Sequence, residues 1–463
     1  MLGLLSACGD DSKPTGPLAS LTIDSLRPSS GAGNVDMGAE VVVYFNRALD
    51  TTTLLSTTLY VTRADDTIPS RISYDRAAHA ARVTAPLLAA STYTVRATTA
   101  IRDTSGASLS ADTLWSFSTH TPEAVVIDAA PNPGYTSLAV GTGGAVHLTY
   151  EVGNQILKYA RCEAACTAPG AWLRVVIDST FAVGRFNALA VDAQDGLHVS
   201  YALEPGTGRA LKYALCRTDC GSTAGWQSAA VDSGHSPDWI TSVVVSGTEP
   251  VAVAFPRQYD SLRIALCSAG CLSSSNWSTL TIAPNVIAAA LAVEQNGRLH
   301  LAYYDNQLWY ATCSSACADG TNWTRVLADT AYGVGNNPSL ALDRNGGIHV
   351  SYYDFARGGG LRYATCASSC TMPSNWTALA IDTAASQGYF SALLMDEAGR
   401  IRIVHGNQLR YSACAVACTR ATQWRTGTLG DTEGGYLSAK LDRSGVLHVS
   451  YLDYASAKIM YLR

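Results

Sequence analysis

Twelve of the thirteen cysteines follow one spacing rule. Each pair has three residues between its members, and a Trp stands six residues after the second Cys. The pairs are Cys162-Cys166, Cys216-Cys220, Cys267-Cys271, Cys313-Cys317, Cys366-Cys370 and Cys414-Cys418, and the Trp residues are Trp172, Trp226, Trp277, Trp323, Trp376 and Trp424. Cysteines that face each other across a tight hairpin lie within disulfide range. Zinc or redox chemistry is the alternative, but six identical copies suit one metal site poorly. We expect six structural disulfides, each worth about 2 kcal/mol, formed in an oxidising compartment.

Histidine and aspartate also recur at fixed positions of the repeated sequence. The second strand of five repeats carries His147, His198, His300, His349 and His448, where Ala252 and Arg402 stand in the other two. The fourth strands of the units end in Asp128, Asp178, Asp232, Asp329, Asp382 and Asp431. A residue repeated in every copy serves the repeat, so we expect buried, hydrogen-bonded histidines and Asp side chains that cap turns. Metal or cation binding is the alternative, and no metal site or other cofactor is predicted.

Side chains that break the repetition are the candidates for ligand binding. One loop set, before each first strand, offers Tyr135, Phe186, Trp239, Tyr389, Phe390 and Tyr436; the other, between strands two and three, offers Glu204, Arg257, Tyr259, Asp260, Asp305, Asp354, Arg357 and Asp453. Aromatic rings beside carboxylates and Arg suit a glycan or peptide. The predicted ligand-binding residues are Trp239, Arg257, Tyr259, Asp305, Asp354, Arg357 and Asp453.

The elements that must position these residues repeat seven times between residues 121 and 463. The first strands begin near Ser137, Ala188, Ser242, Ala290, Ser339, Ser391 and Ser438, at spacings of 47 to 54 residues. Four short strands in each unit of about 50 residues predict a β-propeller. Seven blades are expected, with six or eight as alternatives. The last unit lacks a fourth strand, which Ala124–Asp128 would supply by closing the ring from the N-terminal side.

The turn between the first two strands also repeats. It runs from Asp192 to Gly196, Asp343 to Gly347, Asp396 to Gly399 and Asp442 to Gly445. A type I turn that ends in a glycine at positive φ explains this pattern.

Residues 21–120 contain no cysteine and show short alternating strands, such as Glu40–Phe45 and Tyr93–Arg96, which predict a β-sandwich. With Pro28-Ser29-Ser30-Gly31, Val43-Tyr44-Phe45-Asn46 and Phe117-Ser118-Thr119, the segment resembles the bacterial Ig-like domain of S-layer and other surface proteins. That resemblance implies a spacer or stalk.

The N-terminus resembles the end of a bacterial lipoprotein signal. Leu5-Ser6-Ala7-Cys8 matches the lipobox, which makes residues 1–8 a truncated signal remnant and residues 9–20 a flexible tether. The resemblance implies lipid on Cys8, a membrane partner through that lipid, and a place in the cell envelope outside the cytoplasm. No apolar run reaches 18 residues, so no transmembrane helix is expected.

Composition narrows the function classes. The 463 residues carry a net charge of -5, with 15% charged and 47% hydrophobic residues, which excludes a disordered chain and argues against a nucleic-acid partner.

The repeats resemble sialidase-like propellers with Asp boxes, since the Trp that opens the fourth strand is kept while a Cys pair replaces the Ser and Asp. The Phe/Tyr-Arg-Ile-Pro motif of sialidases is absent. We therefore expect a monomeric, non-enzymatic surface lipoprotein whose propeller binds a glycan or protein. A sialidase-like hydrolase or lyase, and a structural protein without ligand, are the alternatives.

Overall fold

The computed structural model describes residues 20–168, 170–180, 182–204, 208–257, 260–384, 388–430 and 432–463. Its regular elements are β-strands and short 3-10 turns, which confirms the all-β class. The chain forms two compact units: one comprises the described residues to Ala32 with Glu40–Thr84 and Thr92–Phe117, the other Gly33–Ala39, Ala85–Ser91 and Ser118–Arg463. No helix in these ranges is long and apolar enough to cross a membrane. Cys8 lies outside the described residues.

The first unit is built on two sheets. One has the order β1-β3-β7-β6 and the other β2-β9-β8-β4-β5. The strands are β1 (Ile23–Arg27), β2 (Ala32–Val35), β3 (Val41–Phe45), β4 (Leu59–Arg63), β5 (Asp66–Thr67), β6 (Arg71–Asp75), β7 (Ala80–Thr84), β8 (Thr92–Ala97) and β9 (Thr113–Thr119), with the 3-10 turn η1 (Thr51–Thr53). Alternate residues of β8 and β9 are buried, and the Tyr93 and Phe117 rings stack with centroids 5.6 Å apart. The period of two therefore places one face of each strand in the core, as the sequence predicts.

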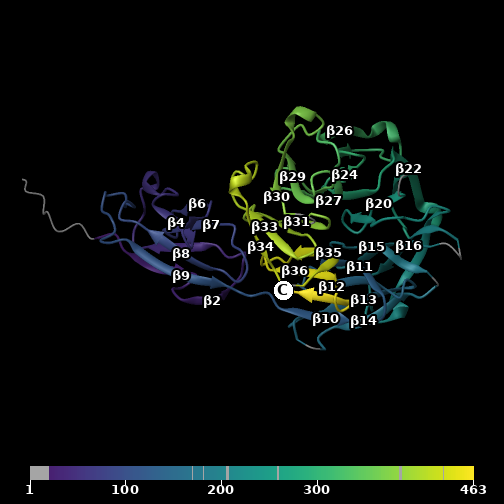
Figure 1. The fold of residues 1–463 in the computed structure, drawn as a ribbon, viewed down its shortest axis with the longest axis horizontal. Coiled ribbons are helices and arrows are strands. Elements are labelled where there is room, and N and C mark those ends of the chain that lie inside the picture. The colour runs from purple at the N-terminus through teal and green to yellow at the C-terminus, as the bar shows by residue number, and fades with distance from the viewer. Residues whose placement is uncertain are drawn as a thin grey trace, which may run out of the picture. The chain divides into compact units, whose positions relative to one another are not determined.

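In the described part of the second unit, strands β10 to β37 form seven four-stranded antiparallel sheets (Figure 1). Six follow chain order: β11 (Pro133–Val140), β12 (Val146–Val152), β13 (Ile156–Cys162) and β14 (Leu173–Asp178); β15 (Val183–Val191), β16 (Leu197–Leu203), β17 (Ala210–Cys216) and β18 (Gln227–Ser233); β19 (Ser242–Val245), β20 (Val251–Arg257), β21 (Ser261–Cys267) and β22 (Trp277–Pro284); β23 (Ala288–Val293), β24 (Leu299–Tyr304), β25 (Leu308–Cys313) and β26 (Thr324–Asp329); β27 (Val334–Leu342), β28 (Ile348–Asp354), β29 (Gly360–Cys366) and β30 (Thr377–Asp382); β31 (Ser391–Met395), β32 (Ile401–His405), β33 (Arg410–Cys414) and β34 (Arg425–Thr428). The remaining sheet combines distant parts of the chain, in the order β10 (Ala124–Asp128), β37 (Lys458–Leu462), β36 (Leu447–Asp453) and β35 (Gly434–Leu441). In it, Val125 pairs with Tyr461.

The first strands of successive sheets contact one another, and β35 of the mixed sheet contacts β11. A repeated hydrogen bond joins them. Ser Oγ on one first strand accepts the N–H of a Leu on the next, at 2.9–3.0 Å, in the pairs Ser137 with Leu189, Ser242 with Leu291, Ser339 with Leu393 and Ser438 with Leu138. The Ser of the repeated S-L-A-V-D phrase therefore links neighbouring sheets.

Aromatic packing also links neighbouring sheets. The third-strand Tyr of one sheet packs against the Trp of the next, with ring centroids 5.0–5.3 Å apart, in the pairs Tyr159-Trp226, Tyr213-Trp277, Tyr310-Trp376, Tyr363-Trp424 and Tyr461-Trp172. The indole N–H of each of the six Trp residues donates to the carbonyl oxygen of the second Cys in its repeat. This bond explains the constant spacing between Cys and Trp.

All six cysteine pairs are disulfides, as expected, with Cα–Cα distances of 5.6–5.8 Å. Each lies between the third and fourth strands of its sheet. In five sheets a short 3-10 turn leads from the disulfide to the Trp; these are η2 (Thr223–Gly225), η3 (Ser274–Asn276), η4 (Gly320–Asn322), η5 (Pro373–Asn375) and η6 (Ala421–Gln423).

The expected role of the turn glycines is correct in two turns and wrong in two. Gly399 and Gly445 have positive φ, whereas in the other two turns the positive φ belongs to Asp195 and Gly346, one residue earlier. At Gly196, a Cβ would lie 2.5 Å from Asp192 Oδ2, and Gly347 has the same relation to Asp343. Glycine is required at these two positions because an Asp side chain folds back against the turn.

Candidate functional site

The repeated histidines form buried hydrogen-bonded chains at one end of the first strands. Each Nδ1 lies 2.5–2.7 Å from a third-strand Tyr hydroxyl, in the pairs His147-Tyr159, His198-Tyr213, His300-Tyr310, His349-Tyr363 and His448-Tyr461. In four repeats Nε2 faces an acid from the adjacent turn, namely Asp192, Glu294, Asp343 or Asp442. Burial lowers the pKa of all five histidines, and that of His147, whose turn has no acid at Gly141, falls to about 4. These histidines are structural and neutral.

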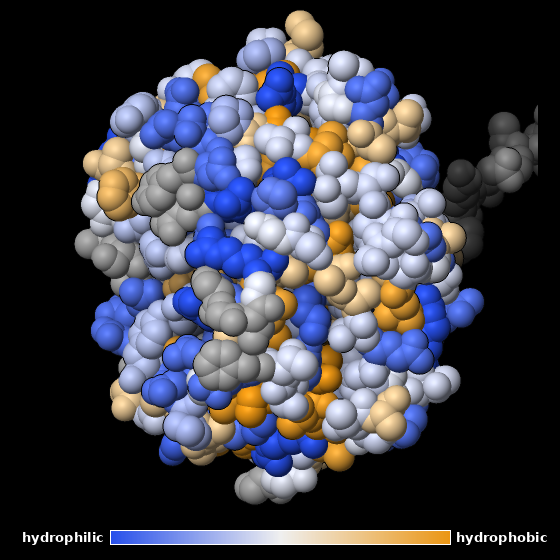
Figure 2. Space-filling model, turned by 90° about the vertical axis from the view of Figure 1, so that its right-hand side faces the viewer, coloured by the Kyte–Doolittle hydropathy of each residue, from blue (hydrophilic) through white to orange (hydrophobic). Residues whose placement is uncertain are grey.

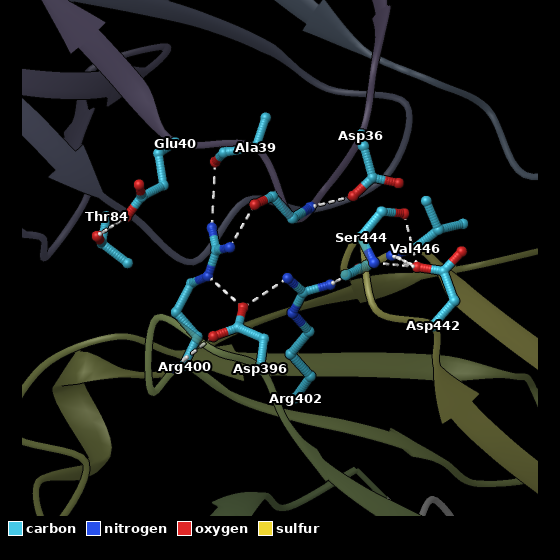
Figure 3. A network of polar contacts seen from close by, with 12 residues as sticks. Asp36, Ala39, Glu40, Thr84, Asp396, Arg400, Arg402, Asp442, Ser444 and Val446 are labelled. Carbon is cyan, nitrogen blue, oxygen red and sulfur yellow. Dashed lines mark hydrogen bonds and ion pairs between the residues drawn. The ribbon is translucent and has the colours of Figure 1, made fainter. Parts of the chain in front are cut away.

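The sixth sheet replaces histidine with a buried arginine. Arg402 Nη2 and Arg400 Nε each lie 2.6 Å from Asp396 Oδ2, and Arg402 Nη1 donates to the Gly445 carbonyl at 2.9 Å (Figure 3). In the neighbouring turn, Asp442 Oδ1 accepts backbone N–H groups two and four residues later. The turn of the sixth sheet therefore keeps its acid, Asp396, although the partner of that acid is an arginine and not a histidine.

The Asp residues that end fourth strands have two roles. One carboxylate oxygen caps the turn, as in Asp178 Oδ1, which accepts the Thr180 N–H at 2.9 Å. The other binds a Lys or Arg on the third strand of the next sheet, in the pairs Asp128-Lys158, Asp178-Lys212, Asp232-Arg263, Asp329-Arg362 and Asp382-Arg410. Asp431 lies outside the described residues. In the described ranges, no group of three or more His, Cys, Asp or Glu side chains is placed to hold a metal ion.

At the opposite end of the first strands, the aromatic loop residues form one continuous cluster. Successive ring centroids lie 4.2–6.3 Å apart in the order Trp239, Phe186, Tyr135, Tyr436, Phe390 and Tyr389. Tyr135, Phe186 and Phe390 are buried by this packing. Trp239 and Tyr389 stand at the ends of the chain and keep part of their surface exposed.

A cavity of about 460 Å³ lies between those two ends. It is lined by four aromatic residues, three asparagines and one isoleucine, which are Trp239, Tyr304, Phe355, Tyr389, Asn285, Asn306, Asn336 and Ile287. These residues come from the third, fourth, fifth and sixth sheets or the loops between them. Phe355 is 66% exposed. Among the described residues, the lining carries no charged side chain, so the cavity offers ring faces and amide groups.

Hydrogen bonds hold three of the lining residues in place. Trp239 Nε1 donates to Asn337 Oδ1 at 2.7 Å, and Asn337 Nδ2 donates to the Tyr389 carbonyl at 2.7 Å. Asn306 Nδ2 donates to Asp305 Oδ1 at 3.1 Å. The predicted residue Asp305 thus touches a lining residue without lining the cavity itself.

Of the other predicted ligand residues that the structure describes, none lines this cavity. Arg257 pairs with Asp260 at 2.7 Å within one loop. Asp354 is buried and pairs with Arg357 at 3.3 Å and with Arg362 Nη1 at 3.6 Å.

Two predicted ligand residues remain. Asp453 is also buried, and its Oδ1 accepts the Ala455 N–H at 3.1 Å. Tyr259 lies outside the described residues.

Two carboxylates lie beside Arg185 near the aromatic cluster. Arg185 Nη1 is 3.9 Å from Glu204 Oε1, and its guanidinium lies 4.9 Å from the centre of the Phe186 ring. Glu151 is 1% exposed, its Oε1 has no hydrogen-bond partner, and burial raises its pKa to about 7. A group so deeply covered cannot reach a polymer substrate, so this cluster does not form an exposed pair of catalytic acids.

Sequence reasoning missed most of the cavity. Phe355, Asn285 and Asn306 occur in loops whose sequence resembles ordinary turns, and Tyr304 and Asn336 lie within β24 and β27. One signal was available, because the residue at the second-strand position of Tyr304 varies between sheets and is therefore not fixed by the repeated fold. The equivalents in the other sheets are Glu151, Ala202, Pro256, Tyr353, Gly406 and Leu452.

Figure 2 shows one face of the molecule, on which hydrophobic residues lie between hydrophilic ones. The exposed large hydrophobic residues include Tyr332, Phe355 and Tyr454. Of these three, Phe355 lines the cavity.

Comparison with known families identifies one domain. Residues 19–119 match the bacterial Ig-like domain family. Such domains are typical of bacterial surface proteins, which agrees with a place outside the cytoplasm. The match covers less than a quarter of the chain, and the search of curated proteins found no match to the chain.

Solved structures resemble the chain only distantly. An α-L-arabinofuranosidase of Fusarium graminearum has 11% identity and a TM-score of 0.47, covering 74% of this chain and 97% of its own. A NanB sialidase variant from Streptococcus pneumoniae has 9% identity and a TM-score of 0.42, covering 91% and 83%. An intramolecular trans-sialidase from Ruminococcus gnavus has 10% identity and a TM-score of 0.39, covering 73% and 95%. With TM-scores below 0.5, none of these structures bears on the function of the cavity.

Proposed function

We propose that the cavity lined by Trp239, Tyr304, Phe355 and Tyr389 binds a neutral oligosaccharide. The apolar faces of sugar rings stack on aromatic side chains, and the amides of Asn285, Asn306 and Asn336 can both donate to and accept from sugar hydroxyls. The volume of about 460 Å³ is suited to a short saccharide. The observation that carries this proposal is the combination of four rings and three amides in one uncharged cavity.

The same lining supports binding without hydrolysis. Glycoside cleavage needs two carboxyl groups on either side of the scissile bond, roughly 5 to 10 Å apart. No Asp or Glu lines this cavity in the described part of the chain, and Asp305 contacts Asn306 from outside it. A cavity without a cation also disfavours acidic sugars, whose carboxylates need Arg or Lys.

The architectural part of the proposal concerns how the cavity is displayed. We infer that the seven four-stranded sheets are the blades of one propeller spanning residues 121–463, closed by the pairing of β10 with β37. Residues 21–120 then form the stalk, residues 9–20 the tether, and residues 1–8 the signal remnant with lipid on Cys8. The protein is proposed to be a monomeric lipoprotein of the cell envelope whose disulfides form outside the cytoplasm.

A glycan array with neutral and acidic oligosaccharides tests the ligand class. We expect neutral glycans to bind and sialylated or uronic-acid glycans to bind at least tenfold more weakly. Isothermal titration of the best neutral ligand should then show a loss of at least tenfold in affinity for Trp239→Ala and a smaller loss for Trp239→Phe, which keeps a ring but lacks the N–H bonded to Asn337. Binding confined to acidic glycans, or release of reducing sugar from any bound glycan, would overturn the proposal.

A further inference from the structure

A second cavity, of about 550 Å³, runs between the first strands of the seven sheets. Its lining comes from β11, β15, β19, β23, β27, β31 and β35 and the residues just before some of them. Apolar side chains such as Val140, Val191, Val245 and Val293 form much of the wall, and hydroxyl groups such as that of Ser438 occur beside them. We call this cavity the axial channel.

One lining residue breaks the repetition of the channel. At the register position opposite the repeated histidine, the first strands carry Ala139, Ala190, Val244, Ala292, Ala341 and Leu394, but Lys440 in the last sheet. Six apolar residues and one lysine at equivalent positions mark Lys440 as a residue that the blade itself does not require. Function is expected where a repeated structure departs from its own rule.

The Lys440 ammonium has no counter-charge in the channel. Among the lining residues, all of which the structure describes, it is the single charged group, and it makes no hydrogen bond or ion pair with a described residue. The Lys440 side chain is exposed to the channel solvent, and the protein around the channel lowers the pKa of its ammonium. By contrast, Lys158 and Lys212 are paired with Asp128 and Asp178.

The titratable groups nearest to Lys440 in the strand register already have hydrogen-bond partners. His448, opposite Lys440, bonds Tyr461 through Nδ1 and Asp442 through Nε2, and its pKa is lowered by burial. His147 on β12 bonds Tyr159 and is likewise neutral. Among the lining residues, the Lys440 ammonium is thus the one charge that faces the channel solvent, beside an apolar wall, and this combination suits a ligand with an anionic head and an apolar tail.

We propose that the axial channel binds the carboxylate of a small aliphatic acid against Lys440. One ammonium matches one negative charge, whereas a phosphate dianion would remain half neutralised. The Val and Ala side chains of the wall give the alkyl tail of such an acid an apolar surface. This site is separate in its lining residues from the proposed saccharide cavity.

The test uses carbon-13 NMR on the full chain. The sequence has only five lysines, Lys13, Lys158, Lys212, Lys440 and Lys458, so signals from lysine labelled at Cε are few enough to resolve. In a pH titration, we expect Lys440 to titrate below the other lysines. Sodium butyrate should shift the Lys440 signal and raise its pKa, while Lys158 and Lys212 serve as internal controls that stay unchanged.

Variants and other ligands complete the test. Lys440→Met should remove the signal and weaken butyrate binding at least tenfold in calorimetry, whereas Lys440→Arg keeps the charge and should retain binding. Butanol should not bind. A Lys440 that titrates at its ordinary pKa and ignores butyrate would overturn the proposal, and equal shifts with chloride or phosphate would show a general anion site instead. Because the first measurement uses the wild-type chain, it does not depend on a variant that folds.

Discussion

The two ends of the first strands carry different chemistry. At the end that we call the turn face, the residues between strands one and two bring an acid, a His and a Tyr together, and four sheets share this arrangement. At the other end, the loop face, Trp239, Tyr304, Phe355 and Tyr389 meet in a cavity that draws on four sheets. Repeated chemistry at the turn face stabilises each of these four sheets, while differing chemistry at the loop face creates a single site.

The largest effect is expected at Asp192 on the turn face. Its side chain is fully buried and accepts from His198 at 3.1 Å and from Arg217 at 2.7 Å. Asp192→Ala removes both of these bonds and the acceptor for the Gln194 and Gly196 N–H groups, so the free energy of unfolding should fall by about 3 to 5 kcal/mol. Urea unfolding followed by Trp fluorescence measures this. Asp343→Ala is the matched control, since Asp343 is more exposed and 3.4 Å from its His, and should cost less. Equal losses, or reduced saccharide affinity in a folded Asp192→Ala protein, would break the distinction between the two faces.

Acid should weaken the turn face through His147. Its pKa falls from 6.5 to about 4 on folding because of burial, so the unfolded chain binds more protons between these values. Stability therefore decreases as pH falls through this window, by about 3 kcal/mol at pH 4 for this one group.

The difference between wild type and His147→Gln isolates that effect, because the opposite contribution of Glu151, whose pKa is raised to about 7, is common to both proteins. Urea midpoints measured from pH 7 to pH 4 should converge as the wild type loses stability faster. Parallel curves would show that His147 is not buried in its neutral form.

At the loop face, Phe355→Ala should reduce saccharide affinity without reducing stability. The side chain is 66% exposed and lines the cavity, so its removal costs little packing but removes one stacking surface. We expect at least a tenfold loss, or about 1.4 kcal/mol of binding free energy. Tyr332→Ala is the control, because Tyr332 is 72% exposed and does not line the cavity. Equal losses in both variants would argue for nonspecific stacking.

The smallest effect concerns the link between β35 and β11. Ser438→Ala removes the acceptor for the Leu138 N–H and should lower the free energy of unfolding by about 1 kcal/mol. Ser137→Ala removes the same bond between β11 and β15 and should cost the same. If Ser438→Ala alone were neutral, the proposed closure of the ring would be weaker than its other junctions.

Several features could be read from the sequence because they are local and repeated. The disulfides, the strands of each repeat and the structural role of His198 and its equivalents each depend on residues close in the chain or on a pattern present in several copies. The acid that faces four of the five histidines was missed, because Asp192 and its equivalents are read from the sequence only as turn residues. The link from Asp178 to Lys212 was missed for a different reason, since it joins neighbouring sheets.

The sequence by itself determined the repeating unit, since hydrophobic alternation, turn residues and cysteine spacing act within about 50 residues. Only the tertiary structure decided which loop residues share a site. Trp239, Asn336 and Tyr389 are separated by 53 to 150 residues, yet they line one cavity because successive sheets bring their loops to the same end of the first strands. Lys440 is an ordinary surface residue in the sequence, and only the packing of seven first strands around the axial channel leaves its charge without a partner.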